Sequence, residues 1–181
     1  MAPRGAADTK GSKAPRGGVI REATKRDLEE VVRLWSDLAR HHAPLDPAFS
    51  LRPAAGEEIR ALVTVQLRDP DAKTFVWECR DGSAKPRPGS GRLGALCMVR
   101  IDRAPPVQRE VERAEITDLI VERALRRRGI GAAILDAALA WVEQSGVERV
   151  EVRVAVGNAE GQAFWRSRAF GDWMDVLHLR L

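Results

Sequence analysis

The sequence predicts an α/β fold in which one mixed β-sheet carries helices on both faces. Strand-like and helix-like segments follow one another in the order β-α-α-β-β-β-α-β-α-β. The chain has 181 residues, which is enough for one domain with a full core and too few for two comfortable ones. Its apolar share is ordinary for a globular protein, and no apolar run reaches about 18 residues, so no membrane span is expected.

The first half of the chain is predicted to form a strand, two helices and a long-looped hairpin. The first helix can begin at Thr24 and Asp27, and its apolar residues recur at helical spacing, which is typical of a helix packed on a core. The second helix is expected to end before Pro70. In chain order, the predicted segments are a strand over 19–24, helices over 26–42 and 55–69, and strands over 73–80 and 92–102.

The second half is more regular. Alternation in its first strand fails near Asp118 to Val121, where a β-bulge is expected. Gly146 suits the end of the following helix, and Asn158 suits the start of the last one. The predicted segments are a strand over 111–121, a helix over 129–145, a strand over 148–156, a helix over 158–169 and a closing strand over 173–181.

The positive charge of the chain is concentrated in its first residues. The net charge is +4, but the first 18 residues carry four basic residues and one acidic residue, which leaves only +1 for the rest. Residues 1–17 are therefore predicted to be a disordered basic tail, and residues 18–181 to be the folded domain. A general surface for nucleic acid is not indicated, although a module that binds nucleic acid through the tail and the arginine run stays as an alternative.

The chain carries no sign of secretion. Its N-terminus lacks the apolar stretch of a signal peptide. Cys79 and Cys97, the only two cysteines, lie in strand-like runs, which suits buried thiols in a reducing compartment. A cytoplasmic location is expected.

The stretch RRRGIG, residues 126–131, has the properties of an anion-binding loop. It connects a strand to an apolar helix, and the first N–H groups of a helix lack intrahelical partners and lie at the positive end of its dipole. Gly129 and Gly131 would let the backbone approach a phosphate closely, and the arginines would add charge. A Walker loop and a dinucleotide fingerprint both fail on spacing. A helix start without a ligand stays as the alternative.

RRRGIG resembles the [QR]xxGx[GA] pattern of the acetyl-CoA pyrophosphate loop in the GNAT superfamily of N-acetyltransferases, with Arg126, Gly129 and Gly131 at its three defining positions. NAEGQAFWRSRAF, from Asn158 on, is similar to the motif that follows in that superfamily, where an Asn begins a helix ending in an aromatic pair and a Phe. The resemblance covers residues 18–181 in element order. It implies the GNAT fold, with a central, mixed, mostly antiparallel twisted sheet of six to seven strands.

The resemblance also implies a site for acetyl-CoA between two splayed parallel strands. The backbone after the expected bulge would pair with the pantetheine arm, the loop amides would hold the pyrophosphate, and the last helix would contact the cofactor arm. The implied cofactor-binding residues are Leu119, Ile120, Val121, Arg126, Arg127, Arg128, Gly129, Ile130, Gly131, Ala132, Asn158 and Trp165.

Acetyl transfer to an amine needs a base more than an acid. A lysine-like amine with a pKa of about 10.4 must lose a proton, which costs roughly 4 to 5 kcal/mol at pH 7, whereas a thiolate leaving group costs only roughly 2 kcal/mol. Glu115 is the first candidate base, because some family members carry a catalytic glutamate at this place on the bulged strand. An ion pair with a neighbouring arginine is the equally weighted alternative. Asp118 is the second candidate.

One departure from the family concerns the acid. Many members place a Tyr in the last helix, but this chain has no tyrosine, and Trp165 occupies the matching position. An indole N–H donates a hydrogen bond but does not deliver a proton, so water or Ser167 would have to serve. A catalytically silent acyl-CoA sensor therefore stays as an alternative function.

The sequence thus predicts an acetyl-CoA-dependent N-acetyltransferase that acts on a small-molecule, polyamine-like or peptide amine. Direct attack is preferred because neither cysteine is expected near the bulge. His41 and His42 end the first helix, where a role in substrate binding competes with a simple helix-terminal one. No metal site, membrane partner or nucleic-acid partner is expected, and homodimer formation is left open.

Overall fold

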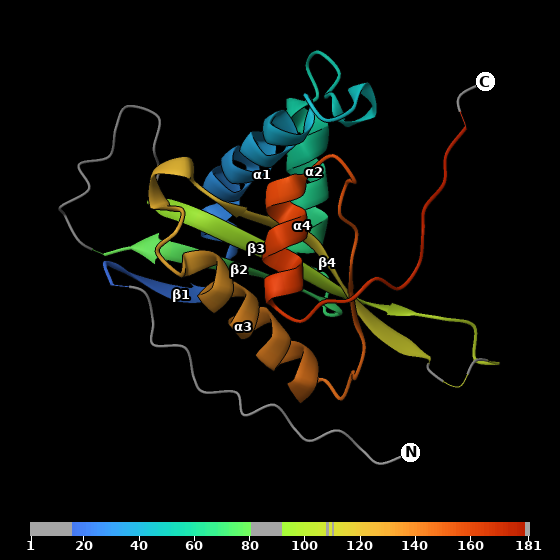
Figure 1. Ribbon diagram of the computed structural model, residues 1–181. Helices are drawn as coiled ribbons and strands as arrows, with labels where there is room; N and C mark the ends of the chain where they lie inside the picture. The colour runs from blue at the N-terminus through green and yellow to red at the C-terminus, as the bar shows by residue number, and fades with distance from the viewer. Residues whose placement is uncertain (1–15, 81–91, 108, 110, 180–181) are drawn as a thin grey trace.

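The computed structural model describes residues 16–80, 92–107, 109 and 111–179, which form one β-sheet with helices on both faces (Figure 1). In this part of the chain the sheet has five strands in the order β1-β2-β3-β4-β5. The first three pairs of strands are antiparallel, and β4 pairs with β5 in parallel. The strands are β1 (Gly18–Glu22), β2 (Ala72–Cys79), β3 (Leu93–Arg103), β4 (Glu112–Val121) and β5 (Val150–Val152).

The predicted mixed, mostly antiparallel sheet is therefore confirmed, with five strands where six to seven were expected. Residues 1–15 of the predicted basic tail over 1–17 lie outside the described residues. The hairpin loop over 81–91 also lies outside them.

Two helices cover each face of the sheet. On one face, α1 (Leu28–His42) and α2 (Gly56–Gln66) pack with apolar side chains of the central strands, among them Leu96 and Ile120. On the other face, α3 (Ile130–Gln144) packs over Cys97 and Ile116, and α4 (Ala159–Ser167) adds Trp165 to the same core.

The α3 helix is almost wholly apolar because it lies against the middle of the sheet. Its contacts extend over β1, β2, β3 and β4. Six of its side chains are buried, namely Ile130, Ala133, Ile134, Leu135, Ala138 and Val142. This burial fixes the position of its first turn, where the arginine and glycine loop ends.

The start of α1 has the predicted capping residues. Thr24 and Asp27 form a reciprocal capping box around a short 3-10 turn, Lys25–Asp27. The Asp27 carboxylate also accepts two hydrogen bonds from the Arg21 guanidinium, at 2.8 and 2.9 Å. These bonds tie the helix to the end of β1.

The predicted closing strand over 173–181 is wrong for the part that the structure describes. Residues 171–179 form neither strand nor helix, and all of them are exposed. In Figure 1 this segment leaves the body of the molecule after α4. The preceding strand is also shorter than predicted, at Val150–Val152 instead of 148–156. Alternation of apolar residues is a local signal, whereas a strand forms only where a second strand meets its edge.

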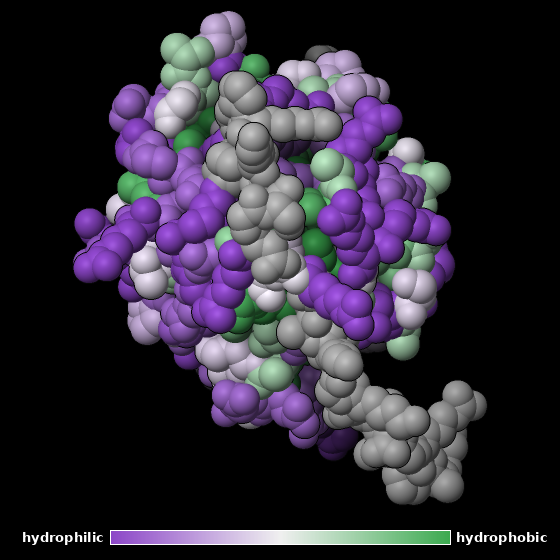
Figure 2. Space-filling view, turned by 90° about the vertical axis from the view of Figure 1, so that its left-hand side faces the viewer, coloured by the Kyte–Doolittle hydropathy of each residue, from purple (hydrophilic) through white to green (hydrophobic). Residues whose placement is uncertain are grey.

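Figure 2 shows the molecule from the left-hand side of Figure 1. The side chains coloured on this face are mainly hydrophilic. Among the residues described, none of the helices combines the length and the apolar character needed to cross a membrane.

Candidate active site

The bulge in β4 lies at Thr117, directly before the stretch where it was expected. Met98 of β3 pairs with Asp118, and the next residue, Val99, pairs with Ile116, so Thr117 is the extra residue in the ladder. The parallel pairing of β4 with β5 ends at the same level, with Ile116 opposite Val152. From there β4 continues to Val121, still paired with β3 but with no strand on its β5 side. The two strands therefore separate right after the bulge.

The bulge also changes which face each β4 side chain occupies. Ile116 lies in the core under α3, and without the extra residue Asp118 would lie on that same face. With it, Asp118 lies on the α1 face together with Ile120, whereas Leu119 and Val121 pack on the α3 side. A carboxylate thus reaches the opening between the strands without being buried under α3.

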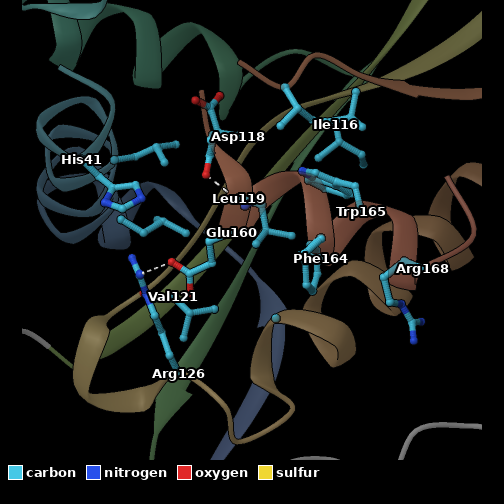
Figure 3. A pocket seen from close by; sticks show the side chains of 18 of the residues that line it. His41, Ile116, Asp118, Leu119, Val121, Arg126, Glu160, Phe164, Trp165 and Arg168 are labelled. Atoms are coloured by element: carbon cyan, nitrogen blue, oxygen red, sulfur yellow. Dashed lines mark hydrogen bonds and ion pairs between the residues drawn. The ribbon is translucent and has the colours of Figure 1, made fainter. Parts of the chain in front are cut away.

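An open cleft of about 660 Å³ occupies the gap between the separated strands (Figure 3). Its walls come from the end of β4, the loop and first turn of α3, residues 152–155, α4 and the end of α1. Of the predicted site residues, the cleft is lined by Asp118, Leu119, Ile120, Val121, Arg126, Arg127, Gly129, Ile130, Gly131, Ala132, Asn158 and Trp165. The structure therefore brings together all but two of them.

The loop before α3 has the backbone that the glycine pattern predicts. Gly129 precedes the helix at φ 80°, and Arg127 also has a positive φ, at 63°. The first amide groups of α3, from Ile130 on, have no earlier helical carbonyl to bond. They lie on the cleft wall beside the exposed Arg127 side chain, an arrangement suited to a phosphate. Arg128 belongs to the same loop, but its side chain is exposed and does not line the cleft.

Arg126 spans the cleft instead of pointing into it. Its Nε donates to the carbonyl oxygen of Val121 at 3.1 Å, and its Nη1 pairs with the Glu160 carboxylate on α4 at 2.9 Å. In Figure 3 this pair lies at one end of the cleft and Asp118 at the other. Nothing in the sequence signalled Glu160, because its contact joins segments 34 residues apart.

The first turn of α4 is held by Asn158, whose side-chain oxygen accepts from the Gly161 amide at 2.9 Å. Its predicted capping role is thus confirmed. Further along the helix, Trp165 is buried, and its ring packs edge-to-face with Phe164 and Phe170, each at a centroid distance of 5.1 Å. The Ser167 hydroxyl lines the cleft and donates to the Phe164 carbonyl at 2.6 Å.

Of the two candidate bases, only Asp118 lines the cleft. Burial raises the pKa of the Asp118 carboxyl, and hydrogen bonds with Thr117 and Trp35 offset part of this effect. Leu38, His41 and His42 at the end of α1 line the same cleft. A raised pKa makes a carboxylate a stronger base, so this side chain suits proton abstraction at neutral pH.

Glu115 lies on the same face of β4 as Asp118, but it does not line the cleft. Its carboxylate, with a side chain only 12 % exposed, pairs with Arg100 at 2.7 Å and with Arg153 at 3.5 Å. The alternative weighed in the sequence analysis, an ion pair with arginine, is therefore present: Arg100 lies on β3, and Arg153 directly follows β5. Of the two candidate bases, the geometry favours Asp118.

The expectation that neither cysteine lies near the bulge was wrong. Cys97 pairs with Leu119, one residue beyond Asp118. Its thiol, however, is fully buried in the α3 core, and this burial raises the pKa of the Cys97 thiol well above its usual range. A thiol in this position is not a nucleophile, so direct attack is still the route that the residues favour.

The histidines at the end of α1 are part of the cleft wall. Burial lowers the pKa of His42, and the neighbouring His41 adds to that effect. The His42 ring packs against the Phe49 ring, with 5.8 Å between the two ring centroids. A packed histidine at this place can shape the wall of the cleft. Within the described ranges, no group of three or more metal-ligating side chains is present.

Residues 28–171 match the acetyltransferase (GNAT) family. The chain belongs to this family, as the loop and the Asn helix indicated. No curated protein matches it in sequence.

Solved structures have the same fold. The tetramutant of the BH1408 protein from Bacillus halodurans superposes with a TM-score of 0.74 at 22% identity, over 90% of this chain and 99% of the other. The aminoglycoside N-acetyltransferase AAC(6')-Iy in complex with CoA gives 0.70 at 17%, over 93% and 99%. A predicted acetyltransferase from Clostridium acetobutylicum with acetyl-CoA gives 0.68 at 14%, over 90% and 96%.

Proposed function

We propose that this chain transfers the acetyl group of acetyl-CoA to a primary amine by direct attack. One observation carries the proposal: a single cleft has free helix-terminal amides and an arginine at one end and a desolvated carboxylate, Asp118, at the other. An anionic cofactor and a proton acceptor are the two things that this reaction requires of a protein.

The cofactor side of the proposal rests on the loop and the separated strand. The amides from Gly129 to Ala132 would receive the pyrophosphate, and Arg127 would add charge. Beyond the bulge, β4 lacks a strand on its β5 side, so its backbone there is available to pair with an extended amide-bearing arm. Two of the similar solved structures support this assignment, because one contains CoA and the other contains acetyl-CoA.

Asp118 would act as the base. The acceptor amine nitrogen attacks the thioester carbonyl carbon, its proton passes to the Asp118 carboxylate directly or through water, and the carbon–sulfur bond breaks. The proton transfer relieves a penalty of roughly 4 to 5 kcal/mol at pH 7 for a lysine-like amine. Glu115 is the alternative base, but it would first have to leave two arginines.

The departing thiolate would take its proton from solvent. Trp165 lines the cleft at the position where the family resemblance implies a tyrosine, and its indole does not supply a proton. The Ser167 hydroxyl donates to a backbone carbonyl. The cost of releasing a free thiolate is only roughly 2 kcal/mol at pH 7, so the reaction tolerates the absence of a dedicated acid.

A small-molecule, polyamine-like or peptide amine is the proposed acceptor. The fold that this chain shares with aminoglycoside acetyltransferases supports an amine acceptor as a class.

The test is CoA thiol release from acetyl-CoA across a panel of polyamines, aminosugars and lysine peptides, followed by mass analysis of the products. We expect release that depends on the amine, together with a mass gain of one acetyl group. Hydrolysis of acetyl-CoA that is indifferent to the amine would contradict a transferase.

A sensor that binds acetyl-CoA without transferring its acetyl group is the second candidate, favoured by Trp165 in place of an acid. It predicts saturable acetyl-CoA binding with no thiol release for any amine in the panel.

A further inference from the structure

Glu122 connects the separated end of β4 to the arginine and glycine loop. It directly follows β4 and precedes the 3-10 turn Arg123–Leu125. Its amide donates to the Gly94 carbonyl oxygen at 2.9 Å, and its carbonyl oxygen accepts from the Leu125 amide at 2.8 Å. Its carboxylate accepts from the Arg33 guanidinium at 2.7 Å. Both the backbone and the side chain of Glu122 are therefore held in place, although this residue does not line the cleft.

Arg33 joins Glu122 to α1 and to the start of β3. It lies on α1, and while its Nη1 donates to the Glu122 carboxylate, its Nη2 donates to the Leu93 carbonyl oxygen at 2.6 Å. One turn earlier on the same helix, the Glu30 carboxylate accepts from the Leu93 amide at 2.7 Å. The side chains of Arg33 and Glu122 are only 24% and 22% exposed, so water competes weakly for this ion pair. The segment that leaves β4 is thus tied to α1 and to β3.

Gly94 makes room for the turn that follows Glu122. A methyl group in place of the Gly94 hydrogen would collide with Cδ1 of Leu125 and come within 3.0 Å of the Trp77 ring. Leu125 packs against the core under α3 and also lines the cleft. In Figure 1 this turn lies beside the start of β3. Leu125 can therefore rest directly on the β3 backbone because position 94 has no side chain.

We propose that Arg33, Glu122 and Gly94 are positioning residues for the phosphate-binding loop, so that acetyl-CoA affinity depends on three residues that do not line the cleft. The inference rests on the assignment of this cleft to acetyl-CoA. The loop would hold phosphates through backbone amides, and such hydrogen bonds weaken steeply when the donor is displaced or turned. Past the bulge, β4 has β3 on one side and no strand on its β5 side. The contacts with α1 and β3 therefore have to hold the loop in register.

The first experiment measures hydrogen exchange by NMR in the ligand-free protein. The amides of Glu122 and Leu125 are both hydrogen-bonded and report directly on the turn. We expect Arg33→Met to speed their exchange by about 10-fold, as loss of a hydrogen bond to a charged group implies, while β2 keeps its native rates. Arg40→Met is the matched control, because Arg40 lies on the same helix and pairs only with the nearby Asp37. Exchange no faster in Arg33→Met than in this control would overturn the proposal.

The second experiment compares two ligands by calorimetric titration. Acetyl-CoA carries the pyrophosphate, whereas S-acetylpantetheine has the same thioester arm without it. Arg33→Met and Gly94→Ala should each weaken acetyl-CoA binding by about 10-fold, since small displacements of binding groups have effects of this size, and leave S-acetylpantetheine binding unchanged. Equal losses for both ligands would mean general damage to the fold and would contradict a positioning role.

Gly18→Ala is the matched control for Gly94→Ala. A methyl group at position 18 would collide with the same Trp77 ring, but from β1, away from the loop. It should leave the affinity for both ligands unchanged, and a loss of acetyl-CoA affinity as large as that in Gly94→Ala would count against the proposal. A native chain that binds neither ligand would reject the cofactor assignment, whereas the exchange rates would still decide whether Arg33 holds the loop.

Discussion

At the scale of single residues, Asp118 owes its place in the cleft to Thr117. This extra residue moves the β4 side chains that follow it to the opposite faces of the sheet. The Asp118 carboxylate therefore meets Trp35 and the end of α1 instead of the core under α3. It thereby becomes desolvated without being enclosed, and its pKa rises. Glu115 lies close by and is neutralised by arginines on two neighbouring segments.

Asp118→Asn should lower kcat by about 100-fold or more, because general-base assistance is worth roughly 10² to 10⁴. Acetyl-CoA affinity should change little. Glu115→Gln is the matched control and should keep most of the turnover. Initial rates at saturating acetyl-CoA measure both. If the control lost more activity than Asp118→Asn, Glu115 would be the base.

The pH dependence of the activity also tests whether Asp118 is the base. A base works in its deprotonated form, and the Asp118 pKa is raised, so activity should fall as the pH drops through a value above the usual range of an aspartate. The charge of Arg100 lowers this pKa. Arg100→Gln should therefore move the acidic limb of kcat/KM to higher pH, and a limb that moved the other way would argue against Asp118.

Glu160 should weaken cofactor binding in the native chain. The ion pair with Glu160 keeps the Arg126 guanidinium from the phosphates of the cofactor. The Glu160 carboxylate also adds a negative charge to the cleft. Glu160→Gln should tighten acetyl-CoA binding by about 2- to 5-fold, as expected for a partly exposed ion pair. Calorimetric titration measures this change, with Glu143→Gln at the far end of α3 as the control. Weaker binding in Glu160→Gln would mean that the pair holds Arg126 in its binding position.

Much of the site could be predicted from local residue patterns. The loop, the bulge and the Asn cap are short-range features, and the structure has each of them. Glu160 and the choice between Glu115 and Asp118 depend on contacts between distant segments. The exclusion of Arg128 from the cleft depends on where its side chain points. No spacing in the sequence encodes these facts.

At the scale of elements, the start of α1 is stabilised by a buried carboxylate. The Asp27 side chain is 3 % exposed and accepts from Arg21 and from Thr24. The Arg21 guanidinium, followed by the Thr24 hydrogen bonds, holds the pKa of the Asp27 carboxyl below its usual range.

Asp27 should therefore make stability depend on acid pH. A folded-state pKa below the unfolded value of about 3.9 means that the contribution is complete above about pH 4 and is lost as the pH falls through the lower, folded value. Asp27→Asn should cost about 1 to 3 kcal/mol at pH 7 and reduce the loss of stability in acid. Urea unfolding at pH 7 and pH 3 measures both. Exposed Glu148→Gln is the control, and an Asp27→Asn variant as acid-sensitive as the native chain would contradict the account.

Helices were the easiest elements to predict, because an amphipathic or apolar helix is specified by its own spacing. α1 and α3 lie within two residues of their predicted ends. Strands at the edge were the hardest. Strands were predicted over 148–156 and over 173–181, yet in the described part of these two segments only Val150–Val152 pairs with a neighbour. A strand requires a partner, and residues 173–179 pair with none of the described strands.

At the scale of the whole molecule, the fold supplies a cleft where two parallel strands separate. Antiparallel pairing holds β4 on one side, and α3 and α4 hold the loop and the aromatic wall on the other. Neither wall alone would bind a long ligand. The proposed function therefore depends on the fold as a whole, and the family assignment agrees with it.

The most direct test of the proposed cofactor site is a thermal melt with and without acetyl-CoA, because it does not require knowledge of the acceptor. At about 100 times the dissociation constant, a ligand adds roughly 2.7 kcal/mol, which for a chain of this size raises Tm by roughly 5 to 10 °C. We predict a shift of that order for the native chain and its loss in Gly129→Glu, which places a negative charge at the loop. No shift at saturating acetyl-CoA, or an equal shift in the variant, would contradict the assignment of this cleft to acetyl-CoA.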